Sequence, residues 1–333
     1  MSMAADTLQQ IGSRAVSLDE AFGRTLAELG GAFSNLVVLD ADSAGETGAH
    51  YFRKSHPERF LQFGVAQQNM MAAAGGLAAV GLLPVVTTFA VFCLRAVEQA
   101  RLSLAYSRRN AKIVASHAGL DAGPDGGLVQ AFEDLAAFRA IPGMTVISPA
   151  DPVETALATR AILDFDGPVY MRAGCHAAKR LFADDHRFEI GKGRILRDGS
   201  DVTLVACGGE VAHALDAAEL LANDGVSARV VNMATIKPID RTLLVRCAAE
   251  TGAFVAAEDH NVHGGLGSAV AEALAQMSPC PLEFVGIKDV FGTSGEPGEL
   301  AEKFALTAPH IAHAAKRAIE RKRNIAGRRK NFR

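Results

Sequence analysis

Long apolar runs are missing from this sequence of 333 residues. A helix that crosses a membrane needs about 20 consecutive apolar residues, and no stretch comes near that length, so we expect no membrane partner. The N-terminal residues MSMAADTLQQIGSRAV also lack the basic patch and apolar core that a secretory signal requires. These two absences predict a soluble protein of the cytoplasm.

Cysteine is scarce and irregularly spaced. The five cysteines are odd in number and form no CxxC pair; they are Cys93, Cys175, Cys207, Cys247 and Cys280. This pattern argues against a disulfide framework and against a zinc site, and it suits a reducing compartment. We therefore expect this chain to hold no metal by itself.

The sequence also lacks a large excess of charge of either sign, since the net charge is only −3. The exception is residues 316–333, where lysine and arginine gather. Such a run can contact nucleic acid, but this one contains a single aromatic residue, Phe332. We therefore prefer a solvated helix end as its interpretation and predict no nucleic-acid partner.

Two series of apolar strands alternate with helices along the chain. In the first series we predict strands at 36–40, 85–89, 112–116, 144–148 and 168–172, with helices at 69–80 and 152–163. In the second we predict strands at 201–207, 227–233, 253–259 and 282–287, with helices near 210–224, 240–251 and 267–276. Asp151 and Glu154 form a capping box before the helix at 152–163.

Continuous apolar strands that alternate with helices are typical of parallel sheets covered on both faces. We therefore predict an α/β protein with two doubly wound parallel-sheet domains. We place the first domain at residues 14–175 and the second at 199–315. A linker at 176–198 separates them, and a basic tail follows at 316–333.

Polar loops follow several of the predicted strands, and open parallel sheets bind ligands at these carboxyl ends. The loops cover residues 40–43, 116–127 and 172–174. The second loop contains His117 and Asp125, and the third offers Arg172, whose guanidinium suits phosphate or carboxylate. Any single Asp or Gly in a loop is more often structural, and Phe89 and Phe92 belong by default to the core.

Several long motifs, in order, resemble one known family. The run RFLQFGVAQQNMMAAAGGLAAVGLLPVVTTFAVF at 59–92 resembles the cofactor-pyrimidine segment of transketolases. SHAGLDAGPDGGLVQAFEDLAAFRAIPGMTVISPADPVETA at 116–156, followed by GPVYMRAG, resembles its continuation, and EDHNVHGGLGSAVAEAL at 258–274 resembles the transketolase C-terminal domain. The resemblance covers about residues 14–315 and is greatest to split transketolases, in which two genes share one enzyme.

The resemblance implies a cofactor and a partner. The family uses thiamine diphosphate with Mg²⁺, and both are held mainly by an N-terminal diphosphate-binding domain that this chain lacks. The resemblance therefore implies an N-terminal partner subunit, a heterotetramer and an active site shared between the subunits. This chain would hold the aminopyrimidine ring of the cofactor.

The resemblance also assigns site residues. Phe92 matches the aromatic residue that stacks on the aminopyrimidine, Phe89 lies beside it, and Asp42 matches an acidic residue of the cofactor-site network. The substrate-facing positions are His117, Asp125 and Arg172. His117 is also a catalytic candidate, and Arg172 matches a phosphate-binding arginine, which implies an anionic substrate.

Gln67 departs from the family pattern. At its position the family has a glutamate that hydrogen-bonds ring nitrogen N1′ of the cofactor and so assists loss of the C2 proton. A carboxylic acid can pass a proton to N1′, whereas an amide can only donate a hydrogen bond. Loss of such assistance costs on the order of 10²–10⁴-fold in rate. Glu98 is a possible displaced acid, although a subunit contact is the preferred interpretation.

Two further departures fall in the loop after the predicted strand at 112–116. Pro124 stands where relatives have an acidic residue, and Val129 stands where they have a substrate-facing histidine. Together with Gln67 these changes cluster on one surface of an otherwise intact scaffold. They favour a repurposed site with a less polar substrate near Val129.

Three functions remain open. The first is a split transketolase-like transferase that makes or breaks a C–C bond next to a carbonyl. The second is a non-catalytic subunit that assembles or regulates such a complex, as Gln67 and Val129 would suggest. The third is the β subunit of a 2-oxo-acid dehydrogenase or a deoxyxylulose-phosphate synthase fragment, both of which share the fold.

Overall fold

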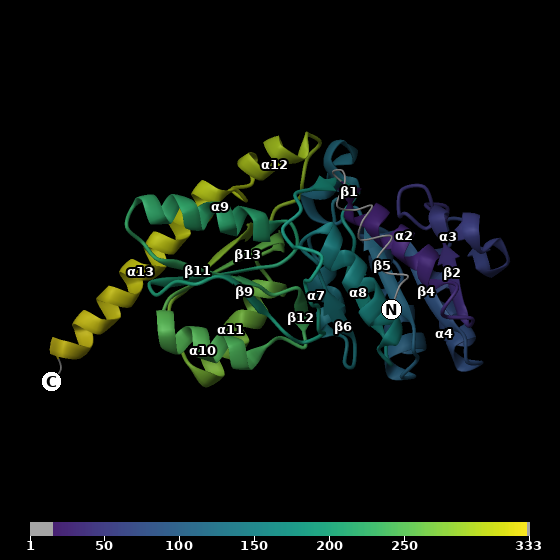
Figure 1. Ribbon diagram of the computed structural model, residues 1–333, viewed down its shortest axis with the longest axis horizontal. Coiled ribbons are helices and arrows are strands. Elements are labelled where there is room, and N and C mark those ends of the chain that lie inside the picture. Colours follow the sequence, from purple (N-terminus) through teal and green to yellow (C-terminus); the bar gives the residue numbers. More distant parts are fainter. Residues whose placement is uncertain (1–15, 332–333) are drawn as a thin grey trace.

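Two β-sheets of mostly parallel strands lie side by side along the long axis of the computed structural model, which describes residues 16–331 (Figure 1). The N-terminal segment and the predicted domain start at residue 14 lie outside this range. So do the side chains of residues 326 and 328–331, which include part of the predicted basic tail, and residues 332–333.

The first sheet has seven strands in the order β12-β6-β7-β5-β4-β2-β3. These are β2 (Leu36–Asp40), β3 (Phe60–Gln62), β4 (Leu83–Phe89), β5 (Lys112–Ser116), β6 (Thr145–Ile147), β7 (Val169–Arg172) and β12 (Thr235–Lys237). All neighbours are parallel except β12, which pairs antiparallel with β6 although it comes from the second half of the chain.

Helices cover both faces of this sheet because successive strand residues point to opposite sides. Val38 belongs to a buried cluster with helices on one side of the sheet, whereas its neighbour Val37 belongs to a different cluster with other helices. The helical elements of this half are α2 (Leu18–Leu29), α3 (His50–Ser55), η1 (Pro57–Arg59), α4 (Gln67–Ala79), α5 (Ala90–Leu94), α6 (Val97–Gln99), η2 (Ala100–Tyr106), η3 (Gly119–Leu128), α7 (Asp134–Ala140) and α8 (Pro152–Asp164). Asp151 caps α8, since its carboxylate accepts the Glu154 amide as predicted.

The second sheet has the order β14-β13-β10-β11-β9, with β9 antiparallel at one edge. Its strands are β9 (Arg194–Arg197), β10 (Val202–Ala206), β11 (Ala228–Asn232), β13 (Phe254–Asn261) and β14 (Leu282–Ile287). The helices are α9 (Glu210–Asn223), α10 (Arg241–Thr251), α11 (Leu266–Met277), α12 (Pro297–Lys303) and α13 (Ala308–Asn331). Helices α9 and α13 pack on one face and α10 and α11 on the other.

The predicted fold class is confirmed, with two α/β sheet domains. The strands at 36–40, 112–116 and 282–287 have the predicted bounds. The segment predicted as a linker contains β8 (Ala177–Ala178), which pairs with β1 (Val16–Ser17), and it contains β9. Strand β12 joins the first sheet although it comes from the second half of the chain. The predicted domain boundaries stay a prediction.

The basic tail continues helix α13, which ends at the far side of the second domain (Figure 1). The Lys316 ammonium lies 2.7 Å from the Asp224 carboxylate, and Lys322 donates to the Thr251 carbonyl at 2.7 Å. The predicted solvated end is therefore partly docked, because these amines reach acceptors on the protein itself. Within residues 16–331, no helix combines the length and apolar character of a membrane span.

His260 lies at the junction of the two domains with its side chain fully buried. Its Nδ1 is 2.6 Å from the Asn261 carbonyl oxygen, to which it donates, and its Nε2 accepts the Ala136 amide at 3.2 Å. These partners suit the neutral ring, because a second ring proton would face the Ala136 N–H. Burial, reinforced by the Arg172 guanidinium, lowers the pKa of His260 to about 4.

We predict that protonation of His260 on unfolding destabilises the protein as pH falls from about 6.5 to about 4. The unfolded histidine binds a proton in this window and the folded one does not. The contribution of His260 to the free energy of unfolding is therefore fully present above pH 6.5. Its loss amounts to roughly 3 kcal/mol. Denaturant unfolding across this range should show a smaller pH slope for His260→Gln than for wild type. The exposed His313 provides the control His313→Gln, and equal slopes in all three proteins would contradict the assignment.

Candidate functional site

The predicted site residues follow neighbouring strands of the first sheet at their carboxyl ends. Asp42 follows β2, Phe89 ends β4, His117 follows β5 and Arg172 ends β7, while Gln67 begins α4 just after β3. Because these parallel strands are adjacent, the fold brings the loops to one edge of the sheet. This is the placement that the sequence predicts.

Gln67 is buried, and the hydrogen-bonding groups of its side chain are only partly satisfied. The residue is 2% exposed, and its side-chain Nε2 finds no hydrogen-bond partner within the described part of the chain. A buried N–H without an acceptor costs about 1–3 kcal/mol, so such a group calls for an explanation. A bound molecule with an acceptor atom at this point would remove the cost.

A hydrogen-bond network fixes the loops that lead to Gln67. The buried Asp40 carboxylate accepts the Ser43 amide at 3.0 Å and the Gln62 side-chain amide at 2.7 Å. In turn, Gln62 Oε1 accepts the backbone amides of Asp42 and Gly64, both at 2.9 Å. Asp42 itself is exposed, with a φ of 62°, so the network orients its backbone and leaves its carboxylate free of these contacts.

The aromatic residues stack beside this edge. The Phe89 ring lies 3.9 Å from the His117 ring and 5.5 Å from the Phe92 ring, with nearly parallel planes in both pairs. The His117 Nδ1 is 2.9 Å from the Ser116 hydroxyl, and burial lowers the pKa of His117. Phe89 and Phe92 are only partly buried, so they are not the ordinary core residues that composition alone would suggest.

The loop after β5 carries the remaining predictions. Asp125 is exposed and Val129 is half-buried. The next residue, Gln130, donates from Nε2 to the Thr293 carbonyl at 2.9 Å, which holds this loop against the second domain. At Gly127 this loop approaches the backbone of the second domain so closely that a Cβ there would lie 2.7 Å from the Gly292 carbonyl oxygen.

Arg172 is engaged in a buried ion pair. Its Nε donates to the Asp134 carboxylate at 2.8 Å, and the same carboxylate accepts from Nη2 and from the Tyr170 hydroxyl. Arg172 also donates to the backbone carbonyls of Asp259 at 2.8 Å and Ala131 at 3.5 Å. Four of its five N–H groups are thus used, so Arg172 is not an open anion clamp. Burial opposes ionisation of Asp134, but the guanidinium still holds the pKa of this carboxyl below its ordinary value.

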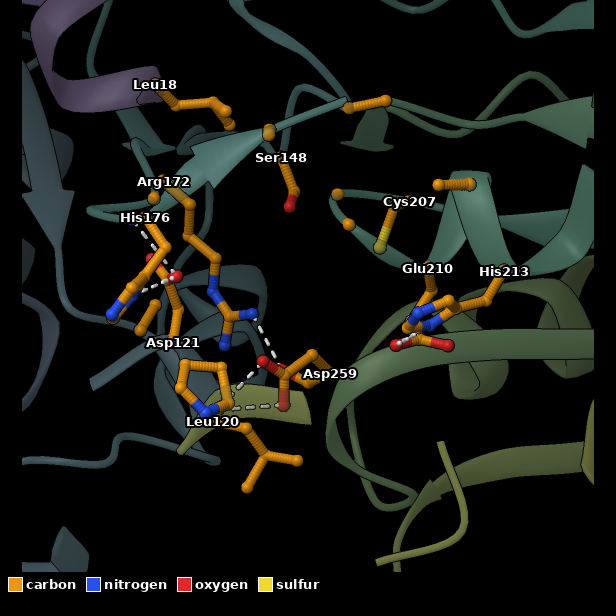
Figure 2. A pocket seen from close by; sticks show the side chains of 18 of the residues that line it. Leu18, Leu120, Asp121, Ser148, Arg172, His176, Cys207, Glu210, His213 and Asp259 are labelled. Atoms are coloured by element: carbon orange, nitrogen blue, oxygen red, sulfur yellow. Dashed lines mark hydrogen bonds and ion pairs between the residues drawn. The ribbon is translucent and has the colours of Figure 1, made fainter. Parts of the chain in front are cut away.

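A pocket of about 440 Å³ lies between the two domains (Figure 2). Figure 2 shows Asp121 and His176 on one side, Glu210 and His213 on the other, and Asp259 beside Leu120 between them. Burial raises the pKa of Asp259 to about 7. The residues that line this pocket include Arg172 but not Gln67, Phe89, Phe92 or Asp42, so this pocket holds only part of the predicted site.

Sequence reasoning missed several residues that shape the site. Asp134, Asp40 and Gln62 appear as ordinary polar positions in the chain. Gln62 lies 22 residues from Asp40, and Asp134 lies 38 residues from Arg172, so a motif of fixed spacing could have found neither pair. Glu98, the possible displaced acid, is exposed on α6 and accepts the neighbouring Gln99 side-chain amide at 2.7 Å.

Known proteins share this architecture. The family model for the transketolase pyrimidine binding domain matches residues 14–176, and that for the transketolase C-terminal domain matches residues 191–311. A Methanocaldococcus jannaschii protein named as a transketolase C-terminal section is 45% identical, with 87% of this chain and 92% of the relative covered. The 6-deoxy-6-sulfo-D-fructose transketolase subunit SqwH of a Clostridium species is 44% identical, with 86% and 89% covered. A solved structure described as a split gene transketolase, inactive beta4 tetramer, has a TM-score of 0.85 and 45% identity, with 93% of this chain and all of that chain covered.

We predict that Asp134→Asn destabilises the protein by about 3–5 kcal/mol, because it leaves the buried Arg172 charge without a counter-ion. Denaturant unfolding measures this change. The surface pair of Arg139 and Glu272, 2.6 Å apart with Glu272 56% exposed, provides the matched control. Glu272→Gln should cost under about 1 kcal/mol. A similarly small loss in Asp134→Asn would show that Arg172 does not depend on this partner.

Proposed function

The chain belongs to the transketolase family, and from this premise we propose that it is one subunit of a split, thiamine-diphosphate-dependent transketolase-like transferase. The reaction class is the making or breaking of a C–C bond next to a carbonyl. The observation that carries the proposal is the buried Gln67 at the carboxyl edge of the first sheet, whose Nε2 has no hydrogen-bond partner among residues 16–331. In this proposal the donor contacts the pyrimidine ring of the cofactor.

The residues at this edge fit the cofactor's aminopyrimidine. Gln67 Nε2 would donate to ring nitrogen N1′, and the exposed parts of Phe89 and Phe92 would pack against the ring. When bound, the cofactor supplies the electron sink that the chemistry needs. The side chains of this chain orient the ring, and the aromatic stack keeps water from one of its faces.

An N-terminal partner subunit would complete the active site. It would hold the diphosphate and Mg²⁺, since a hard cation prefers oxygen ligands. The solved relative described as an inactive beta4 tetramer supports this view, because chains of that kind assemble without forming an active enzyme. We propose a heterotetramer of two such subunits and two copies of this chain.

Gln67 alters the activation step. An amide donates a hydrogen bond to N1′ but has no acidic proton to transfer, so binding of the ring survives while acid–base assistance is lost. The network around Asp40 and Gln62 is intact, and so is the Phe89–His117 stack. The chain therefore keeps the means to position a cofactor and changes one chemical property of the site.

The substrate would be anionic and less polar than an ordinary ketose phosphate near Val129. The Clostridium relative is named for a sulfonated ketose, which is a modified sugar with an anionic end. In this chain His117 and Asp125 would contact substrate hydroxyls. Arg172 has one uncommitted N–H for the anion, so it would act together with a cationic group of the partner subunit.

A non-catalytic subunit is the second candidate, and Gln67 is the observation that favours it. Such a subunit would assemble with a partner and bind the cofactor without assisting the C2 proton's removal. The β subunit of a 2-oxo-acid dehydrogenase is the third candidate. Turnover of pyruvate by this chain together with its partner subunit would favour it.

The first test measures exchange of the cofactor's C2 proton in D₂O with the chain, its partner subunit, thiamine diphosphate and Mg²⁺. We expect Gln67→Glu to raise the exchange rate by on the order of 10²-fold, because it restores an acid next to N1′. The neighbouring Gln68 is exposed, so Gln68→Glu is the matched control and should leave the rate unchanged.

The rate in wild type separates the candidates. Exchange well above that of free cofactor supports the altered transferase, whereas exchange at the free rate that Gln67→Glu rescues supports the non-catalytic subunit. An unchanged rate in Gln67→Glu would show that Gln67 does not contact the pyrimidine.

The second test concerns substrate choice. We predict that Val129→His raises kcat/KM for a polyhydroxylated ketose phosphate by up to about tenfold, since one added hydrogen bond is worth about 0.5–1.5 kcal/mol. The adjacent Leu128 is 89% exposed, so Leu128→His is the control and should have no effect. Ordinary ketol transfer at full rate by wild type would sink the less-polar-substrate proposal.

A further inference from the structure

Three metal-ligating side chains converge at the edge of the inter-domain pocket. Asp121 belongs to η3, the loop after β5, and Cys175 and His176 follow β7. The Asp121 carboxylate, the Cys175 sulfur and the His176 Nδ1 all lie within 4.8 Å of one another. Figure 2 shows Asp121 and His176 pointing toward each other beside the pocket.

The distances between the donor atoms suit a metal ion with tetrahedral coordination. Cys175 Sγ lies 3.5 Å from His176 Nδ1. Zinc bonds of about 2.3 Å to sulfur and about 2.0–2.1 Å to nitrogen, at a tetrahedral angle, place such a pair about 3.5 Å apart. Asp121 Oδ1 is 2.9 Å from the same Nδ1, a hydrogen-bond distance that must open by a few tenths of an ångström when an ion replaces the shared proton.

The backbone already orients the donors. The Asp121 carboxylate accepts the amide N–H groups of both Cys175 and His176, and the Cys175 thiol donates to the Asp121 carbonyl at 3.1 Å. The loop after β5 and the loop after β7 are thus tied together before any ion is bound. A preformed arrangement of this kind lowers the ordering cost of binding.

A nucleophilic relay does not fit the same atoms. In a Cys-His-Asp relay, one ring nitrogen faces the thiol and the opposite nitrogen faces the carboxylate. Here Nδ1 of His176 faces both Cys175 and Asp121, so no proton path runs through the ring. The shared nitrogen is what a common ion at the centre of the three donors requires.

Contrary to the expectation from cysteine spacing alone, we propose that Asp121, Cys175 and His176 form a binding site for a borderline-soft divalent cation of the zinc class. Thiolate and imidazole ligands select such ions over Mg²⁺ and Ca²⁺, which prefer oxygen. Three protein ligands leave a fourth position, and His176 and Asp121 line the 440 Å³ pocket from which a water molecule or a pocket ligand would fill it.

The site connects to the proposed active-site loop. Asp121 shares that loop with Asp125 and Val129, so an ion would restrain the residues that we place near the substrate. The proposal does not depend on the chain's catalytic function, because the three donors all belong to this subunit.

Co²⁺ titration of the purified full-length chain tests the site. We expect one equivalent of Co²⁺ to give a thiolate charge-transfer band and visible bands of tetrahedral coordination, and one equivalent of Zn²⁺ to abolish them. Excess Mg²⁺ should not compete. Cys175→Ser should remove the charge-transfer band, and His176→Ala, at a 47% exposed side chain, should weaken affinity at least tenfold without disturbing the fold.

Matched controls separate this site from incidental binding. Cys280 is also partly buried and unpaired by disulfide, so Cys280→Ser should keep the band, as should His313→Ala on α13. Circular dichroism checks that each variant is folded. A wild-type protein without a thiolate band, or a band that survives in Cys175→Ser, would overturn the proposal.

Discussion

The buried ion pair between Arg172 and Asp134 connects the parts of the molecule on which the site depends. It joins the end of β7 to the first turn of α7, and Arg172 also reaches the Asp259 carbonyl on β13 of the second domain. Two charges removed from water are tolerated only when their hydrogen-bonding groups are satisfied. Tyr170 and the backbone carbonyls satisfy most of these groups, so the pair holds β7, α7 and β13 together.

This junction separates two regions that share the loop after β5. On one side, Gln67 and the stacked Phe89 and His117 lie at the carboxyl edge of the first sheet. On the other, Asp121 and His176 face the pocket between the domains. Gly119 allows the two regions to meet, since a Cβ there would lie 2.2 Å from an Asp259 carboxylate oxygen. Changes in that pocket can therefore reach the loop after β5, where the proposed function places substrate contacts, through direct contacts.

The proposed departure at Gln67 is local. In this structure the network of Asp40 and Gln62 and the stack of Phe89 on His117 lie at the same edge of the sheet. Because an amide and a carboxylic acid have nearly the same shape, an exchange of glutamate for glutamine would alter proton chemistry without altering packing. Under the proposed function, the residues that hold the ligand are separate from the group that activates it.

The sequence by itself determined the fold class, the main strands and the sheet edge that carries the site. Apolar runs at 36–40 and 112–116 are fully buried strands, as expected in a sheet covered on both faces, and 282–287 is a partly buried edge strand. Asp151 caps α8 because a cap acts on the next few residues.

The tertiary structure decided the strand pairings and side-chain clusters that join residues far apart in the sequence. The three-residue strand β12 is too short to signal its pairing with β6, and its place in the first sheet follows from the packing of the domains. Asp134 lies 38 residues before Arg172, and Asp121 lies 54 residues before Cys175, so no local spacing announces either cluster. Local patterns fix backbone conformation, whereas the chemistry of a site depends on which side chains the folded backbone brings together.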